Sequence, residues 1–318
     1  MKSNAPQRRS AGGFTLVEML TTMAIAAILI SLLVPAFGLI RNAATSVRQK
    51  AQFNAIGLAL EGYRTDFKDY PPSNYFVPGA MVGTDYCGAQ KLAEAVVGWD
   101  GFGVHPQTAF QGTGMNDVDG DSLPELIYDV LNGIRGTNTN VAQPVQTFVD
   151  NRRVRKGPYL ELEAANAVRL SDIYGSGNLP AIGGTALADT YVLADQFGKV
   201  THARTRKKTG MPILYFKANL AGYQHVLPVP MNSANIPNLK YNVRDNRPFY
   251  FTPPPFALNS QHPLGSGEQA QFYQRTTNTN LTGPLPQPYR SESYILLSAG
   301  RDGLYGTADD VFNFDTEQ

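Results

Sequence analysis

The chain has 318 residues, of which 42% are hydrophobic and 17% charged, and its formal net charge is +1 with a pI near 7.8. A nearly neutral chain has no general attraction for nucleic acid or acidic substrates, so we expect no nucleic-acid partner. Its length allows one substantial core, or one core with large insertions. Cys87 is the sole cysteine, which excludes an intrachain disulfide and leaves packing, with or without a metal, to hold an extracytoplasmic domain.

The N-terminal region joins a basic flank to a long apolar segment. Residues 12–18 read GGFTLVE, and residues 19–40 carry no charge. At ~1.5 Å per residue, roughly 22 residues give a helix about 33 Å long, enough to span a bilayer. In a secretory signal the small residues of the cleavage site follow the apolar core, but here they precede it. We therefore expect a retained membrane anchor with Arg8 and Arg9 as its positive-inside flank, or as a twin-arginine address in the alternative interpretation.

This arrangement resembles the class III signal of type IV prepilins and of the pseudopilins of type II secretion. The resemblance implies that a prepilin peptidase, which is also an N-methyltransferase, removes residues 1–13 as a leader peptide. Cleavage would fall between Gly13 and Phe14, and Phe14 would be N-methylated. Glu18 then becomes the fifth mature residue and Pro35 the twenty-second, where the family has glutamate and usually proline.

Glu18 is predicted to act in filament assembly, because a carboxylate in an apolar segment of this length is costly unless it has a partner. After cleavage the ammonium group of Phe14, on the same subunit or on a neighbour, would offset that cost and set the register between helices. The alternative is a protonated Glu18, or one that reaches the membrane face. Pro35 removes a helical hydrogen bond and is expected to kink or locally melt the helix.

The helix is predicted to continue past the membrane. From Ile40 to Leu58 apolar residues recur at spacings of three and four, which indicates an amphipathic helix. The sequence KDYPP at 68–72 ends the pattern, because residues before proline disfavour the helical conformation. We expect a transmembrane and assembly half over 14–40 and a periplasmic half over 41–70.

Residues 71–318 are predicted to form an α+β, pilin-like globular domain, in which the long N-terminal helix packs on a small antiparallel sheet. Strands rich in aromatic and β-branched residues are expected at 191–193, 213–216 and 294–297. Short helices are expected over 92–97 and 123–131. The stretches near 73–150 and 219–290 are rich in Gly, Pro and Asn, and we interpret them as loop insertions rather than core.

The C-terminal sequence SAGRDGLYGTADD at 298–310 holds three carboxylates separated by glycines. Carboxylates on tight turns suit a hard cation that prefers oxygen ligands. The segment resembles the calcium loop of the major, G-type pseudopilin of type II secretion. The resemblance implies a Ca²⁺ site that orders this loop at a subunit contact, with a solvated acidic turn as the alternative. The implied ligands are the side chains of Asp302 and Asp309, the main-chain carbonyls of Ala299 and Leu304, and an oxygen of Thr307, with Asp310 as an adjacent acid.

Shorter stretches also resemble the major pseudopilin, at 65–71, 156–160, 195–199 and 212–215. The typical major pseudopilin is much shorter than this chain. A second acidic run, Asp117, Asp119 and Asp121, resembles the first half of an EF-hand loop. Ser122 and Tyr128 stand where such a loop requires Gly and Glu. A polar turn is therefore the favoured interpretation of this run, and a looser calcium site the alternative.

We expect no enzymatic activity, because the four histidines have no metal-ligand spacing and no nucleophile or phosphate-binding motif is present. The resemblance implies a structural subunit of a type II secretion pseudopilus that promotes protein transport. It would reside in the inner membrane with its C-terminal domain in the periplasm. It would polymerise through its helix with like subunits and other pseudopilins on an inner-membrane assembly platform with a cytoplasmic ATPase. The alternatives are a type IV pilin for adhesion, motility or DNA uptake, and a membrane-anchored calcium-dependent binding or hydrolytic domain.

Overall fold

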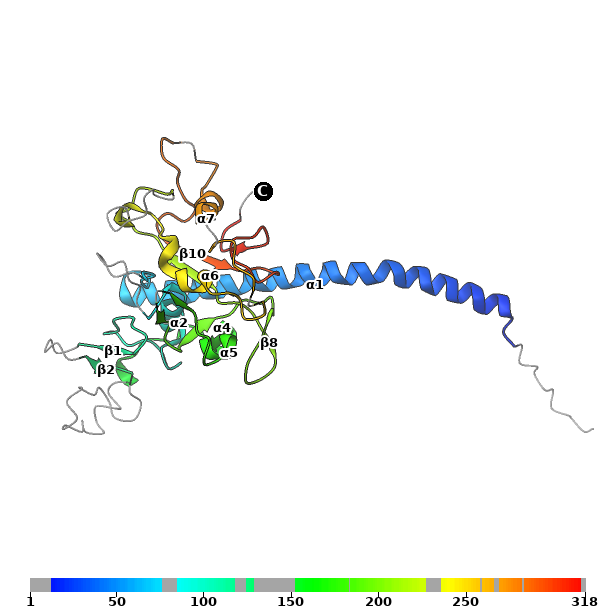
Figure 1. The fold of residues 1–318 in the computed structure, drawn as a ribbon, viewed down its shortest axis with the longest axis horizontal. Helices are drawn as coiled ribbons and strands as arrows, with labels where there is room; N and C mark the ends of the chain where they lie inside the picture. The colour runs from blue at the N-terminus through cyan, green and yellow to red at the C-terminus, as the bar shows by residue number, and fades with distance from the viewer. Residues whose placement is uncertain are drawn as a thin grey trace, which may run out of the picture. The chain divides into compact units, whose positions relative to one another are not determined.

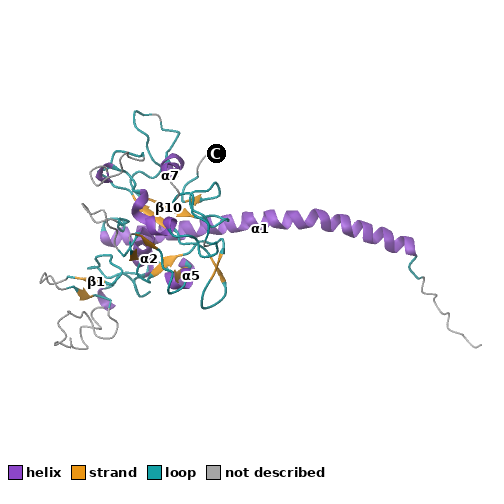
Figure 2. Cartoon of the chain, viewed as in Figure 1, coloured by secondary structure: helices purple, strands orange, loops and turns teal. Residues whose placement is uncertain are grey.

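The computed structural model describes most of the chain (Figure 1). The described residues are 13–75, 85–117, 124–128, 152–182, 184–226, 236–257, 259–265, 269–281 and 283–315. The chain divides into two compact units, Met1–Val47 and Arg48–Gln318. Helices, short strands and many connecting loops make up the second unit (Figure 2), so the predicted α+β class is confirmed.

Helix α1 (Leu16–Phe67) has 52 residues and runs through both predicted halves without a break. It ends where expected, because Lys68 adopts a left-handed conformation with a φ of 68° and Pro71 and Pro72 follow. Pro35 lies within α1, but its side chain is outside the described part, and the expected local melting is not seen.

The first half of α1 exposes its large apolar side chains, among them Ile25, Leu29 and Leu33. Its hydroxyl groups are satisfied within the helix, since each donates to a main-chain carbonyl one turn back. The three pairs are Thr21 with Glu18, Thr22 with Met19, and Ser31 with Ile28. In the described part of the chain, none of the helices contains a stretch long and apolar enough to cross a membrane. The predicted transmembrane half at 14–40 stays a prediction.

The central sheet of the second unit is antiparallel, with the strand order β11-β10-β9. Its strands are β9 (Leu214–Lys217), β10 (Tyr294–Ser298) and β11 (Val311–Phe312). The strands predicted at 213–216 and 294–297 are thus β9 and β10, paired with Leu296 opposite Tyr215. The strand predicted at 191–193 is β6 (Tyr191–Leu193), which pairs with β3 (Ala167–Arg169) in a separate two-stranded sheet.

Side chains of the central sheet alternate between two hydrophobic clusters, as the two-residue period of a strand requires. On one face Tyr215 and Leu296 pack in a cluster that includes Ile56 and Leu60 of α1. On the other face Phe216 and Leu297 belong to a larger cluster, joined by Tyr241, Phe249 and Phe272. Because these last three come from the stretch at 219–290, that stretch forms part of the core, contrary to its interpretation as loop insertion.

Helix α2 (Gly88–Val97) is buried along its whole length and begins earlier than predicted. The predicted helix at 123–131 is wrong over its described residues. There β2 (Glu125–Leu126) pairs with β1 (Met115–Asn116), and this pairing satisfies main-chain groups that the predicted helix would have paired within itself.

The remaining elements are short. The strands are β4 (Ala181–Ile182), β5 (Thr185–Ala186), β7 (Val200–Thr201) and β8 (Lys208–Thr209). The helices are α4 (Leu162–Ala165), α5 (Leu170–Tyr174), η1 (Ile236–Asn238), η2 (Val243–Asn246), α6 (Arg247–Phe251) and α7 (Gln269–Thr276). Among them, α7 matters most for the C-terminal loop.

Candidate functional site

The predicted cleavage point lies directly before α1. Gly13 and Phe14 precede the helix and have no regular secondary structure. Phe14 is 78% exposed, and among the described residues no atom outside the chain neighbours of Gly13 lies within 4 Å of its Cβ position. The predicted cleavage between these two residues stays a prediction, and the described residues leave Phe14 accessible.

Thr15 and Glu18 form a capping box at the start of α1. The main-chain N–H and the hydroxyl of Thr15 donate to Glu18 Oε2 at 2.8 Å and 2.7 Å, and the main-chain N–H of Glu18 donates to Thr15 Oγ1 at 3.2 Å. This reciprocal pattern satisfies two main-chain donors that a helix start leaves unpaired. Sequence analysis missed Thr15, although the spacing T-x-x-E before an apolar run is the signal for such a cap.

The capping box also places the Glu18 carboxylate beside the predicted new N-terminus. Glu18 accepts from the N–H of Thr15, the residue next to Phe14. Cleavage would convert the Phe14 nitrogen into an ammonium group at that same helix start, where a carboxylate is also favoured by the helix dipole. The predicted pairing of Glu18 with this ammonium concerns the processed chain and stays a prediction.

The carboxylate loop, which we define as residues 299–310, connects β10 to β11. The pair Ser298 and Val311 closes its base. Gly300 and Gly306 have φ values of 64° and 95°, a region that only glycine enters readily. A Cβ atom on Gly300 would lie 2.2 Å from the carbonyl oxygen of Asp309. The loop therefore folds back on itself tightly, which explains the spacing of its glycines.

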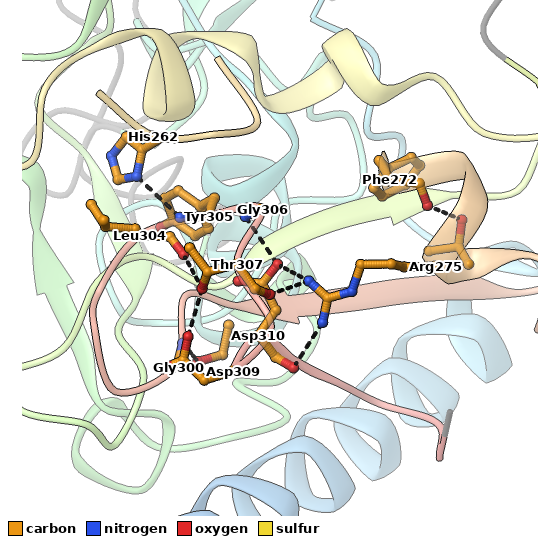
Figure 3. Close-up of polar contacts among 12 residues, drawn as sticks. His262, Phe272, Arg275, Gly300, Leu304, Tyr305, Gly306, Thr307, Asp309 and Asp310 are labelled. Atoms are coloured by element: carbon orange, nitrogen blue, oxygen red, sulfur yellow. Dashed lines mark hydrogen bonds and ion pairs between the residues drawn. The ribbon is translucent and has the colours of Figure 1, made fainter. Parts of the chain in front are cut away.

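Four of the six predicted calcium ligands converge inside this loop. Asp309 Oδ2 accepts from the N–H of Asp302 at 2.9 Å, and Asp302 Oδ1 accepts from the N–H of Leu304 at 2.7 Å. The hydroxyl of Thr307 contacts Asp309 Oδ1 at 2.5 Å and the carbonyl oxygen of Leu304 at 3.2 Å (Figure 3). Two carboxylates, one hydroxyl and one carbonyl thus lie within hydrogen-bonding reach of one another.

The charges of Asp302 and Asp309 are incompletely balanced. Burial raises the pKa of Asp302, and the neighbouring Asp309 adds to this rise. Burial also opposes ionisation of Asp309, but hydrogen bonds from the Thr307 hydroxyl and the Asp302 N–H outweigh it and lower the pKa. Within the described residues, neither carboxylate forms an ion pair with a basic side chain. Two such carboxylates beside a hydroxyl and a carbonyl are a donor set that fits a hard cation such as Ca²⁺.

The number of acidic side chains limits what the loop can hold. The described part of the chain contains no group of three or more His, Cys, Asp or Glu side chains placed to hold a metal ion. A cation in the carboxylate loop would therefore need main-chain carbonyls and the Thr307 hydroxyl to complete its shell. Such mixed oxygen ligands are usual for Ca²⁺.

Asp310 lies apart from this pair. Its Oδ2 atom accepts from Arg275 Nη1 at 2.7 Å and from the N–H of Gly306 at 2.9 Å, and its side chain is only 2% exposed. Burial raises the pKa of Asp310, and the Arg275 guanidinium opposes that rise. Sequence analysis missed Arg275, because no local pattern in α7 relates this arginine to a loop about thirty residues away.

Ala299, the remaining predicted ligand, is buried at the start of the loop. Its N–H donates to the carboxylate of Asp195, which also accepts from the hydroxyl of Ser298 at 2.8 Å. Asp195 is buried, and burial raises its pKa to about 7. Asp195 thus supports the base of the loop, and its only sequence signal was the resemblance of 195–199 to the major pseudopilin.

The histidine His262 supports the middle of the carboxylate loop. Its Nδ1 atom accepts from the main-chain N–H of Tyr305 at 3.1 Å, so the ring is neutral with its proton on Nε2. Burial lowers the pKa of His262 to about 4. The ring of Tyr305 packs beside it, and the Tyr305 hydroxyl donates to the carbonyl of Pro212. Sequence analysis assigned this histidine no role.

The second acidic run is only partly visible. Asp117 is exposed at the end of a described segment, whereas Asp119 and Asp121 lie outside the described residues. Tyr128, at the position where an EF-hand needs Glu, is buried and donates its hydroxyl to Glu94 at 2.8 Å. Tyr128 is therefore part of the buried interior of the domain and is not in the position of a calcium ligand.

Comparison with protein families identifies the N-terminal region. The model of the prokaryotic N-terminal methylation motif matches residues 8–34. This match confirms a type IV prepilin-like N-terminus, which indicates a type IV pilin or pseudopilin-like protein that is processed by a prepilin peptidase. No curated protein and no solved structure matches the chain. The assignment to the G-type pseudopilin therefore has no support beyond the resemblance of its motifs.

Proposed function

We propose that this protein is a structural subunit of a type II secretion pseudopilus that assembles through the first half of α1. The observation that carries the proposal is the methylation motif at residues 8–34. The capping box of Thr15 and Glu18, directly after the uncovered Gly13–Phe14 bond, supports it. Removal of the leader would leave the ammonium group of Phe14 and the carboxylate of Glu18 at one end of the helix. An ion pair between these groups on neighbouring subunits would set the register of the helices.

The exposed surface of α1 supports polymerisation with like subunits. Large apolar side chains cover the first half of the helix, and the described hydroxyls there are satisfied by main-chain carbonyls. A helix of this kind loses little by entering an apolar environment, since few polar groups remain to be desolvated. We propose that the inner membrane provides this environment before assembly and neighbouring helices provide it afterwards, with the C-terminal domain in the periplasm.

The carboxylate loop supports the pseudopilus over a type IV pilus. We propose that it binds Ca²⁺ through the side chains of Asp302 and Asp309, the Thr307 oxygen, and the carbonyls of Leu304 and Ala299. The ion would neutralise two adjacent carboxylates and fasten the loop between β10 and β11. A type IV pilin remains the alternative because it shares the processing motif, and we expect no enzymatic activity from either.

The test of processing is the intact mass and N-terminal sequence of the protein from membranes, with and without the cognate prepilin peptidase. We expect a chain that begins at Phe14 and carries one added methyl group, and a full-length chain when the peptidase is absent. A chain that keeps residues 1–13 in the presence of the peptidase, or one cut beyond Ile40, would refute the proposal. A deletion strain would then separate the two filament types, because loss of secreted folded proteins with normal motility favours the pseudopilus.

A further inference from the structure

The carboxylate loop is held by a helix that lies far from it in the sequence. Arg275, near the end of α7, reaches the loop and donates through Nη1 to Asp310 Oδ2 at 2.7 Å and to the main-chain carbonyl of Thr307 (Figure 3). We propose that Arg275 is a positioning residue that holds the carboxylate loop in its cation-binding form before any cation arrives. This inference rests on the calcium site proposed above.

The contacts of Thr307 show how Arg275 would act on the ligands. Thr307 gives its carbonyl to Arg275 and turns its hydroxyl to Asp309. A guanidinium that holds the carbonyl fixes the main chain of Thr307, and this main chain carries the hydroxyl that donates to Asp309 and to the carbonyl of Leu304. In the described structure Arg275 contacts neither of the two carboxylate ligands, Asp302 and Asp309, and it acts on them through its contacts with Thr307 and Asp310.

The charge balance of the loop points to the same role. Three carboxylates lie within the loop, and Arg275 neutralises Asp310. The two that remain, Asp302 and Asp309, match the charge of one divalent cation. Without Arg275 a buried carboxylate would lose its counter-charge, a change that strongly disfavours the closed loop.

Helix α7 provides a rigid support for this arginine. Phe272 and Tyr273 are buried in the main core, and the ring of Phe312 lies 5.2 Å from the Arg275 guanidinium carbon. The next residue, Thr276, is fully buried and bonded to the carbonyl of Phe272 at 2.6 Å. A side chain carried by a packed helix loses little additional freedom when it binds the loop.

The experiment compares Arg275→Gln with Arg301→Gln in the full chain, purified in detergent. Arg301 is an exposed arginine of the same loop and serves as the matched control. In chelator we expect Arg275→Gln to raise the rate of protease cleavage within the loop by roughly tenfold or more, because it increases the open population. Calorimetric titration with calcium chloride should show that Arg275→Gln binds calcium roughly tenfold more weakly than wild type, because part of the binding free energy is used to close the loop. Arg301→Gln should change neither quantity more than about twofold.

Further variants separate positioning from general damage. Arg275→Lys keeps the charge but not the planar fork, so it should give an intermediate cleavage rate. In a cycle of Arg275→Gln and Asp310→Asn, the effects should be less than additive because the two residues act as one contact. Additive effects, or an Arg275→Gln chain that matches the Arg301→Gln control, would overturn the proposal. A wild-type chain that binds no calcium but has a loop that Arg275→Gln opens would refute the calcium site, yet support Arg275 as the residue that orders the loop.

Discussion

Single residues in this protein act mainly by satisfying main-chain groups at the ends of elements. Thr15 and Glu18 do so at the start of α1, His262 does so in the middle of the carboxylate loop, and Asp195 accepts from the side-chain hydroxyl of Ser298 at the base of that loop. Asp195 and His262 are both buried. Burial raises the pKa of Asp195 and lowers the pKa of His262, so the neutral form of each side chain is favoured. Protonation of His262 is the change that would disturb the loop most directly, because its Nδ1 atom must stay unprotonated to accept from Tyr305.

We predict that the loop loses stability in acid through His262. Its pKa is lowered from 6.5 to about 4 in the folded chain, so between these values the unfolded chain binds more protons. The stabilisation is complete above pH 6.5 and is lost as the pH falls toward 4, by about 3 kcal/mol at most. In urea unfolding from pH 7 to pH 4, His262→Asn should flatten this loss, because the asparagine oxygen accepts from Tyr305 without titrating.

His225 provides the comparison for that series. Burial also lowers its pKa to about 4, but it contacts Thr276 rather than the loop. We therefore expect His225→Asn to reduce the pH dependence of global stability while leaving the acid sensitivity of loop cleavage unchanged. A His262→Asn chain with the full wild-type pH dependence would contradict the assignment.

At the scale of elements, the carboxylate loop depends on backbone conformations that a side chain would forbid. The hairpin between β10 and β11 turns at glycines with positive φ, and it is then fastened from outside by α7. The two strands form a rigid base for the loop, because β10 is buried along its whole length. The loop should consequently be the first part of the sheet to respond to a local substitution.

We predict that Gly300→Ala destabilises the protein by about 1 to 3 kcal/mol, since the new Cβ meets a carbonyl oxygen at a φ of 64°. The measurement is the midpoint of urea unfolding followed by the fluorescence of Trp99, the sole tryptophan. The control is Gly177→Ala, a glycine in an exposed turn with nothing within 4 Å of its Cβ position. Equal effects of the two substitutions would mean that the loop conformation is not required for stability.

At the scale of the whole molecule, the second half of α1 and the central sheet form one core. Ile56 and Leu60 are fully buried against the face of the sheet that carries Tyr215 and Leu296. Leu58 lies between them in sequence but is 76% exposed, as the helical period requires. The helix that we propose for assembly therefore also stabilises the globular unit.

We predict that Ile56→Ala costs about 2 to 5 kcal/mol of unfolding free energy, from lost burial and the cavity left behind. Leu58→Ala on the same helix should stay within about 0.5 kcal/mol of wild type. Urea titration of the full-length chain in detergent gives both values. A large loss for Leu58→Ala, or a negligible one for Ile56→Ala, would show that the helix face packed on the sheet has been assigned wrongly.

The sequence by itself determined the features that depend on neighbours along the chain. The methylation motif, the long helix with its end before Pro71, and the strands at 191–193, 213–216 and 294–297 all follow from local spacing and composition. The proximity of Asp302 and Asp309 was implied by the resemblance of residues 298–310 to a calcium loop, and the glycines between them permit the turn that brings them together.

Only the tertiary structure decided which residues from distant segments meet. It brought Arg275 to Asp310, Asp195 to Ser298 and His262 to Tyr305, and it placed aromatic residues of the 219–290 stretch in the core. It also replaced a locally plausible helix near 125 by a strand pair. The physical reason is that such contacts are selected by burial and hydrogen-bond satisfaction across the fold, which leave no periodic signal in the sequence.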